Sequence, residues 1–313
     1  MGCRIVNYEP GMDERLAQLL NIGWQQMRPV HPRDDKWPTV TPEVVALWRE
    51  QGRLSEAGTF IAQDEDGTPA AVFSVSAGDA EEGTLHLFRT SPDSAGRQIA
   101  AETLAAAEEY LRESGMKTVV TERVDSRGEQ RVEFLRQEGY YDPDPGNRSM
   151  TMLLQPAGHK LREVALRDER CRLVTWRDEY LGEWLHIRNT VFGGAMNEDD
   201  FERAFLSGES FDPAGWFFAK HGDELVGITC GLVVRNDDGS ARGGYLTAVA
   251  VLDEYHGRGL GRALVTASLN YLVEREISPI ALNTEPFRKA ALALYANLGF
   301  VMTNYNLRLR KEL

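Results

Sequence analysis

The stretch that decides the fold of this chain reads His256-Gly257-Arg258-Gly259-Leu260-Gly261-Arg262. It follows residues 245–251, whose β-branched and apolar side chains predict a strand. It precedes a run in which apolar residues from Leu260 to Tyr271 recur at the spacing of one buried helix face. A glycine-rich turn between a strand and a helix lets backbone N–H groups approach a polyphosphate at the positive end of the helix. Arg258 and Arg262 add positive charge at the rim of this turn.

The same stretch fails the sequence tests for two other phosphate-binding loops. A dinucleotide-binding loop, G-x-G-x-x-G, needs a third glycine where Arg262 stands. A Walker loop needs G-K-[ST], which is absent from the stretch. A plain glycine turn that lets the helix pack against the strand is the alternative to a phosphate cradle.

The first half of the chain repeats three features of the second half in the same order. A β-hairpin pattern at residues 59–73 corresponds to one at 216–228, residues 95–100 correspond to 256–261, and residues 134–140 correspond to 294–300. Internal repetition of this kind predicts two homologous domains. Because Pro and Gly mark a join at residues 155–160, we expect a first domain over residues 1–155 and a second over residues 161–313.

Each half has the same expected order of elements. Helices come first, followed by an antiparallel hairpin, a further strand, a helix, a strand, a helix and a closing strand. This order predicts a mixed α/β (α+β) fold with a largely antiparallel sheet flanked by helices in each domain.

Composition narrows the class of partner. The chain has 48 acidic and 35 basic residues and a formal net charge of −13, which disfavours nucleic acid and favours cationic partners. Solubility is the alternative explanation of this acidity. The three cysteines are scattered and H-E-x-x-H is absent, so no metal site is expected. No apolar run approaches the ~18 residues of a membrane helix, and we expect a cytoplasmic protein without membrane contact.

The glycine-rich stretch and a second motif, at residues 291–300, together resemble two sequence signatures of the GCN5-related N-acetyltransferase (GNAT) superfamily. The superfamily's core signature, Arg/Gln-x-x-Gly-x-Gly/Ala, is present here as His256-x-x-Gly259-x-Gly261, with His in the first position. Its second signature, Ala-x-x-Leu-Tyr-x-x-x-Gly-Phe, is matched in full by residues 291–300. The resemblance implies that acetyl-CoA is the acyl donor and that its pyrophosphate contacts residues 256–262, namely His256, Gly257, Arg258, Gly259, Leu260, Gly261 and Arg262.

The resemblance also implies roles for other residues of the second half. Val249, Ala250 and Val251 would form a splayed strand that pairs with the pantetheine arm. Tyr295 would be the general acid that protonates the leaving thiolate, although its apolar neighbours also suit a core aromatic residue. Asn283 and Glu285, at the end of the next strand, would lie beside the place where the splayed strand separates from its neighbour.

Either Asn283 or Glu285 could bind the amine, and Glu285 could act as its base, the alternative being a solvated loop carboxylate. Tyr245, Thr247 and His256 are further proton-handling candidates. Cys230 is expected to be a buried small residue.

The first half departs from the signatures at three positions. Gln98, Ala100 and Leu135 stand where the second half has Gly259, Gly261 and Tyr295. The first domain is therefore expected to be degenerate and non-catalytic.

A decayed first half is also a feature of mycothiol synthase and its relatives, which the chain resembles at residues 211–213 and 188–192. The glutamate that this narrower group would have early in the motif strand is replaced by Tyr245.

These expectations combine into one function. We expect an acetyl-CoA-dependent N-acetyltransferase, without a metal, in which the primary amine of a small and cationic molecule attacks the thioester directly. The protein would be a monomer or a homodimer. Two alternatives remain open, a non-catalytic acyl-CoA-binding or scaffold protein and a protein N-terminal acetyltransferase.

Overall fold

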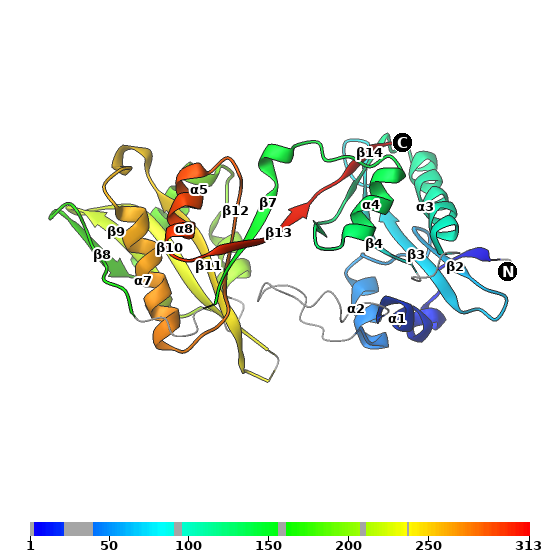
Figure 1. Cartoon of the computed structure of the whole chain (residues 1–313), viewed down its shortest axis with the longest axis horizontal. Coiled ribbons are helices and arrows are strands. Elements are labelled where there is room, and N and C mark those ends of the chain that lie inside the picture. The colour runs from blue at the N-terminus through cyan, green and yellow to red at the C-terminus, as the bar shows by residue number, and fades with distance from the viewer. Residues whose placement is uncertain (1–2, 22–39, 91–95, 156–160, 207–210, 237) are drawn as a thin grey trace. The chain divides into compact units, whose positions relative to one another are not determined.

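The computed structural model of the chain describes residues 3–21, 40–90, 96–155, 161–206, 211–236 and 238–313. These residues form two compact units. The first unit contains the described residues up to Ser149 together with Asn304–Leu313, and the second contains those of Met150–Thr303. Each unit is a sheet with helices packed on it (Figure 1).

The first unit has a six-stranded sheet. Its strands lie in the order β1 (Arg4–Asn7), β2 (Thr59–Gln63), β3 (Pro69–Ser76), β4 (Glu82–Thr90), β5 (Thr118–Thr121) and β14 (Arg310–Glu312). Neighbours are antiparallel except for β4 and β5, which are parallel. The helices are α1 (Asp13–Asn21), α2 (Pro42–Glu50), α3 (Gly96–Glu113) and α4 (Glu129–Gln137), and a short strand β6 (Val124–Asp125) follows β5.

The second unit repeats this plan. Its strands lie in the order β13 (Val301–Leu307, of which the residues up to Thr303 belong to this unit), β7 (Ser149–Leu154), β12 (Ile280–Thr284), β11 (Ala241–Val251), β10 (Glu224–Arg235), β9 (Trp216–His221) and β8 (Cys171–Thr175). Strands β11 and β12 are parallel, whereas the pairs β7–β12, β10–β11, β9–β10 and β8–β9 are antiparallel. The helices are α5 (Leu181–Phe192), α6 (Glu198–Phe201), α7 (Leu260–Glu274) and α8 (Lys289–Asn297).

The predicted fold class is confirmed in both halves. The hairpins are β2–β3 and β9–β10, and the glycine-rich stretch joins β11 to α7. The short strands β1 and β8, which precede the helices of each half, were not predicted, because neither has a long apolar run. The residues expected at the join, 156–160, lie outside the described residues.

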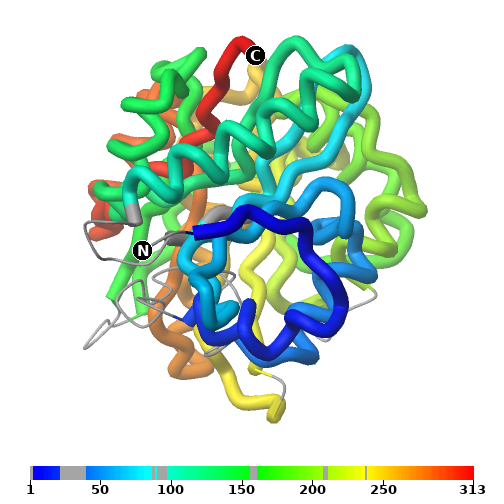
Figure 2. The backbone as a smooth tube through the Cα atoms, turned by 90° about the vertical axis from the view of Figure 1, so that its right-hand side faces the viewer, coloured from blue at the N-terminus to red at the C-terminus, as the bar shows by residue number. Residues whose placement is uncertain are grey.

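The units of the structure differ from the predicted boundaries of 1–155 and 161–313 in the strand that ends each half. Strand β7 belongs to the first sequence repeat but pairs with β12, and its Met152 and Leu154 are buried in the core of the second unit. Strand β14, at the C-terminus, pairs with β5 of the first unit. The red C-terminal segment accordingly lies among cyan and green segments of that unit (Figure 2). This difference follows from strand pairing between distant segments, which a repeat pattern does not encode.

Candidate active site

Strands β11 and β12 separate in the middle of the second sheet. Their parallel pairing ends at Leu246 and Leu282. Opposite β10, the register of β11 shifts by one residue between Thr247 and Ala250, which marks a β-bulge. Within the bulge Ala248 has a φ of 52°, an uncommon conformation for a residue with a Cβ atom. The bulge turns β11 away from β12, so residues 247–251 keep an edge that β12 does not pair.

The glycine-rich loop has the geometry of an anion cradle. Gly257 and Gly259 have φ angles of 77° and 82°, which favour glycine. Gly259 is the residue before α7, and the first N–H groups of that helix have no partner within it. A Cβ atom added at Gly257 would meet no atom within 4 Å, and one at Gly259 would meet only the side chain of Arg167, at 3.5 Å. An added Cβ would therefore meet no backbone among its nearest atoms at either glycine, and its nearest neighbour at this face of the loop is a flexible cation.

Three arginines surround the loop. Arg258 donates to Asp168 Oδ2 at 3.2 Å and lies over the ring of Tyr255. Arg262 is exposed, and the Arg167 side chain passes beside Gly259. Neither Arg167 nor Arg262 forms an ion pair within the described residues. Both cations are therefore available to a phosphate group, and Arg167 was missed because an isolated arginine before β8 forms part of no sequence pattern.

His256, the first residue of the core signature, turns back toward the strand. Its Nε2 lies 2.9 Å from the carbonyl oxygen of Val251 and 3.7 Å from Asp253 Oδ1. The imidazole thereby links the end of β11 to the start of the loop. Through this contact, His256 helps to hold the loop in place.

Tyr295 lies in α8 and is buried, with 5% of its surface exposed. Burial raises the pKa of its phenol to about 12, and the nearby Glu285 and Tyr245 add to this rise while Arg288 opposes it. The ring packs edge-on against Phe300. The phenol is therefore protonated at physiological pH, which a proton donor requires, and it also belongs to the apolar core, as the alternative interpretation expects.

Glu285 follows β12 and is held by an ion pair. Arg288 Nε donates to its Oε2 at 2.6 Å, and the same guanidinium lies 5.2 Å from the ring centre of Phe192 on α5. Asn283 stands near the end of β12, where its backbone is in register with Thr151 of β7. Arg288 lowers the pKa of the Tyr295 phenol and Glu285 and Tyr245 raise it, so each of the three acts electrostatically on Tyr295.

The two motifs of the narrower resemblance have structural contacts. Asp212 accepts a hydrogen bond from Tyr271 Oη at 2.8 Å and another from the backbone of Ala214. The side chain of Asn189 bonds both the N–H and the carbonyl of Met196. These contacts fix the segments before β9 and after α5. Cys230, as expected, is fully buried.

The corresponding residues of the first half have a different backbone. Helix α3 begins at Gly96, whereas α7 begins at Leu260, which aligns with Ile99. Gln98 is therefore inside the helix, where its amide donates to Glu102 at 3.0 Å. Leu135 is completely buried at the position of Tyr295. Ala95, also part of the aligned stretch, lies outside the described residues.

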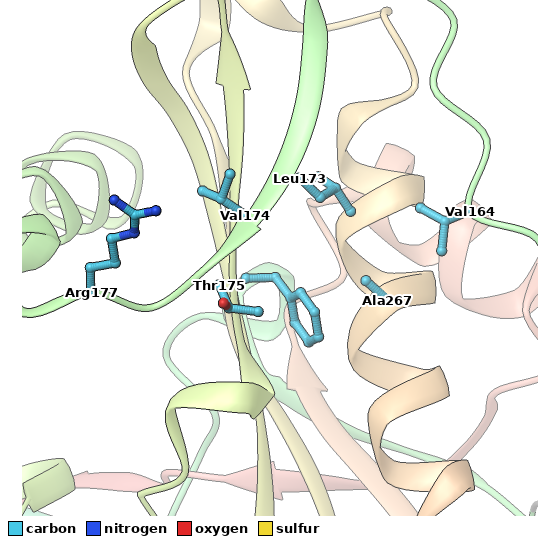
Figure 3. A pocket seen from close by; sticks show the side chains of 7 residues that line it. Val164, Leu173, Val174, Thr175, Arg177 and Ala267 are labelled. Atoms are coloured by element: carbon cyan, nitrogen blue, oxygen red, sulfur yellow. The ribbon is translucent and has the colours of Figure 1, made fainter.

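A cavity of about 520 Å³ lies elsewhere in the second unit. Its lining is mainly apolar. Ala267 of α7 and Val164, from the segment before β8, lie on one side, and Leu173 of β8 lies on the other (Figure 3). It contains none of the predicted site residues. Within the described ranges, no cluster of three or more His, Cys, Asp or Glu could hold a metal ion, and no helix is long and apolar enough to span a membrane.

Comparisons with known proteins bear on the family and the fold of the chain. The model of the acetyltransferase (GNAT) family matches residues 16–140 and 173–300. A mycothiol acetyltransferase from Acidimicrobium ferrooxidans is 32% identical over 130 residues, which cover 40% of this chain and 42% of the relative. N-alpha-acetyltransferase 30 from Xenopus laevis is 40% identical over 86 residues, 27% of this chain and 31% of the relative. The matches thus span less than half of these curated relatives.

A solved tandem GNAT protein from the clavulanic acid biosynthesis pathway has a similar fold. It superposes with a TM-score of 0.66 at 16% identity and covers 99% of this chain and 98% of its own. The similarity extends over both units and concerns the fold alone.

Proposed function

Since this chain belongs to the acetyltransferase (GNAT) family, we propose that its second unit transfers an acetyl group from acetyl-CoA to the primary amine of a small molecule. The observation that carries this proposal is the open glycine cradle at the start of α7, next to the unpaired edge of β11. The first can hold a pyrophosphate and the second can pair with an extended amide-containing arm. Acetyl-CoA supplies both groups and a reactive thioester.

The backbone provides the contacts to the donor. N–H groups at residues 257–262 bind the pyrophosphate, with Arg167 and Arg262 adding charge at its rim. Residues 249–251 pair with the pantetheine arm, and a backbone N–H there stabilises charge that develops on the thioester oxygen. The cradle therefore fixes the distance from the helix to the reacting carbonyl.

Tyr295 is proposed as the proton donor to the leaving sulfur. Its pKa of about 12 lies roughly 3–4 units above that of a thiol near ~8.5, so complete transfer alone would be uphill by about 5 kcal/mol. The transfer becomes favourable when it is coupled to the proton that the attacking nitrogen must lose. Tyr295 therefore acts in concert with deprotonation of the amine.

Glu285 is proposed as the partner of the amine. Its carboxylate accepts a hydrogen bond from Arg288 Nε at 2.6 Å, which fixes the orientation of the carboxylate. An ammonium group is attracted to this carboxylate, loses its proton there or to water, and attacks the thioester carbon. Asn283, two residues earlier on β12, is proposed to orient the same group.

The test is a comparison of matched amines. Cationic, neutral and anionic primary amines of similar size are assayed by thiol release from acetyl-CoA at two ionic strengths. We expect the cationic amine to have the highest kcat/KM, with an advantage that shrinks at high salt. If none of the amines in the panel causes thiol release, the proposal is contradicted and a non-catalytic acyl-CoA-binding protein is favoured.

A protein N-terminus is the second candidate acceptor. The similarity to N-alpha-acetyltransferase 30 favours it, although it covers only 27% of this chain. A panel of short peptides with free α-amino groups, run beside the small amines, separates the two acceptors.

A further inference from the structure

Three side chains of the first unit form a relay that the proposed acetyl transfer does not use. Ser76 Oγ, at the end of β3, lies 2.7 Å from His86 Nε2 on β4. His86 Nδ1 lies 2.9 Å from Glu122 Oε1, directly after β5. The second oxygen of Glu122 accepts from Arg53 at 3.0 Å. The order hydroxyl, imidazole and carboxylate is the arrangement that activates a nucleophilic serine.

The carboxylate determines which way the protons point. An ionised carboxylate can only accept hydrogen bonds, so in a neutral imidazole Nδ1 carries the proton and donates it to Glu122. Nε2 then has a lone pair and accepts from the hydroxyl of Ser76. Arg53 and His86 hold the pKa of Glu122 below its usual value against the opposing effect of burial, which keeps this carboxylate ionised.

The relay lies where two strands separate. Pairing of β4 with β5 ends at Leu85 and Thr121, and the register against β3 skips His86, which is therefore a bulge residue. The corresponding place in the second unit is the end of the pairing between β11 and β12. All three side chains are partly exposed, and His86 retains 17% of its side-chain surface. A small molecule can reach them from solvent.

We propose that Ser76, His86 and Glu122 form a second catalytic site, which takes acyl groups from small esters or thioesters onto Ser76 and hydrolyses them. Ser76 Oγ bonds to the carbonyl carbon while its proton moves to His86 Nε2. The bond from that carbon to the leaving oxygen or sulfur breaks, and the leaving group takes the proton. Water then attacks the acyl-serine with the same proton path and regenerates Ser76.

The competing account is that the relay only braces the sheet. Under that account the hydrogen bonds tie β3, β4 and β5 together, and the hydroxyl is no more reactive than any other. Ser114 provides the comparison, because its exposed hydroxyl donates to the carbonyl of Tyr110 and contacts no base.

The test uses a fluorophosphonate probe on the full-length protein, with the modified residue located by peptide mass mapping. We expect a single adduct on Ser76 and none on Ser114. Ser76→Ala should abolish the adduct, and His86→Ala should slow labelling by ~10²–10⁴-fold, with partial recovery on adding imidazole. Hydrolysis of p-nitrophenyl acetate should follow the same order.

Absence of an adduct on Ser76 in the unaltered protein would overturn the proposal without reference to any variant. So would a folded His86→Ala protein, checked by its melting temperature, that labels Ser76 at the original rate. Glu122→Gln is the third variant, because it preserves shape and removes the charge that orients the imidazole. It should slow labelling by less than His86→Ala does.

Discussion

Replacing Gly259 by alanine tests whether the glycine cradle binds the donor. Gly259 has a φ of 82°, and the left-handed region costs a residue with a Cβ atom roughly 1–2 kcal/mol. The three atoms nearest to the added Cβ would all belong to the flexible Arg167 side chain, the closest at 3.5 Å, so no large steric cost is added. We therefore expect the variant to fold, with a melting temperature lower by about 2–4 °C per kcal/mol.

Binding of acetyl-CoA should fall by more than this backbone effect explains. The methyl group would occupy the space in which the phosphates approach the N–H groups. Loss of one charge-assisted hydrogen bond costs about 1.5–3 kcal/mol, which weakens the Kd by roughly 10- to 150-fold. Calorimetry with acetyl-CoA measures this loss directly and also gives the stoichiometry, for which we expect one site per chain.

Gly239→Ala is the matched control. Gly239 lies in the turn between β10 and β11 and has a φ of 79°, and a Cβ atom added there would meet no atom within 4 Å. It should lose similar stability and keep its affinity for acetyl-CoA. If the Gly259→Ala and Gly239→Ala variants bind acetyl-CoA with equal affinity, the glycine-rich loop is not the pyrophosphate site.

Three further predictions concern the acid, its pH dependence and the C-terminal strand. Tyr295→Phe should lower kcat by ~10²–10⁴ and leave the calorimetric Kd for acetyl-CoA nearly unchanged; unaltered turnover with chemistry rate-limiting would return Tyr295 to the core. Because burial raises the Tyr295 pKa to about 12, its donor form persists up to that pH, so kcat/KM should rise with pH as the amine loses its proton and should show no alkaline fall below pH ~10. Lys311→Met should destabilise the protein by about 3–5 kcal/mol in urea unfolding, because it strips the cation 2.7 Å from Glu108, whose side chain is only 5% exposed. Adding Glu108→Gln should recover most of that loss, and a single variant as stable as the original would show that the pair contributes nothing.

The sequence alone predicted those features whose cause is local. Gly257 and Gly259 indicate a left-handed turn wherever they occur, since residues with a Cβ atom avoid that region. The hairpin patterns and the buried face of α7 follow from the periods of 2 and 3.6 residues. Repetition of these patterns predicted two homologous units, and the motif that contains Tyr295 predicted the family.

Tertiary structure decided the features that depend on distant partners. The sequences of β7 and β14 do not indicate which strand each one pairs with, and only the fold shows that β7 pairs with β12 and β14 with β5. The approach of Arg167 to Gly259 likewise joins segments that no spacing rule connects. The relay of Ser76, His86 and Glu122 comes from three separate segments, the end of β3, the bulge within β4 and the residue after β5, so it could not be predicted. Its physical cause is register, since a shift of one residue would turn these side chains to the opposite face of the sheet.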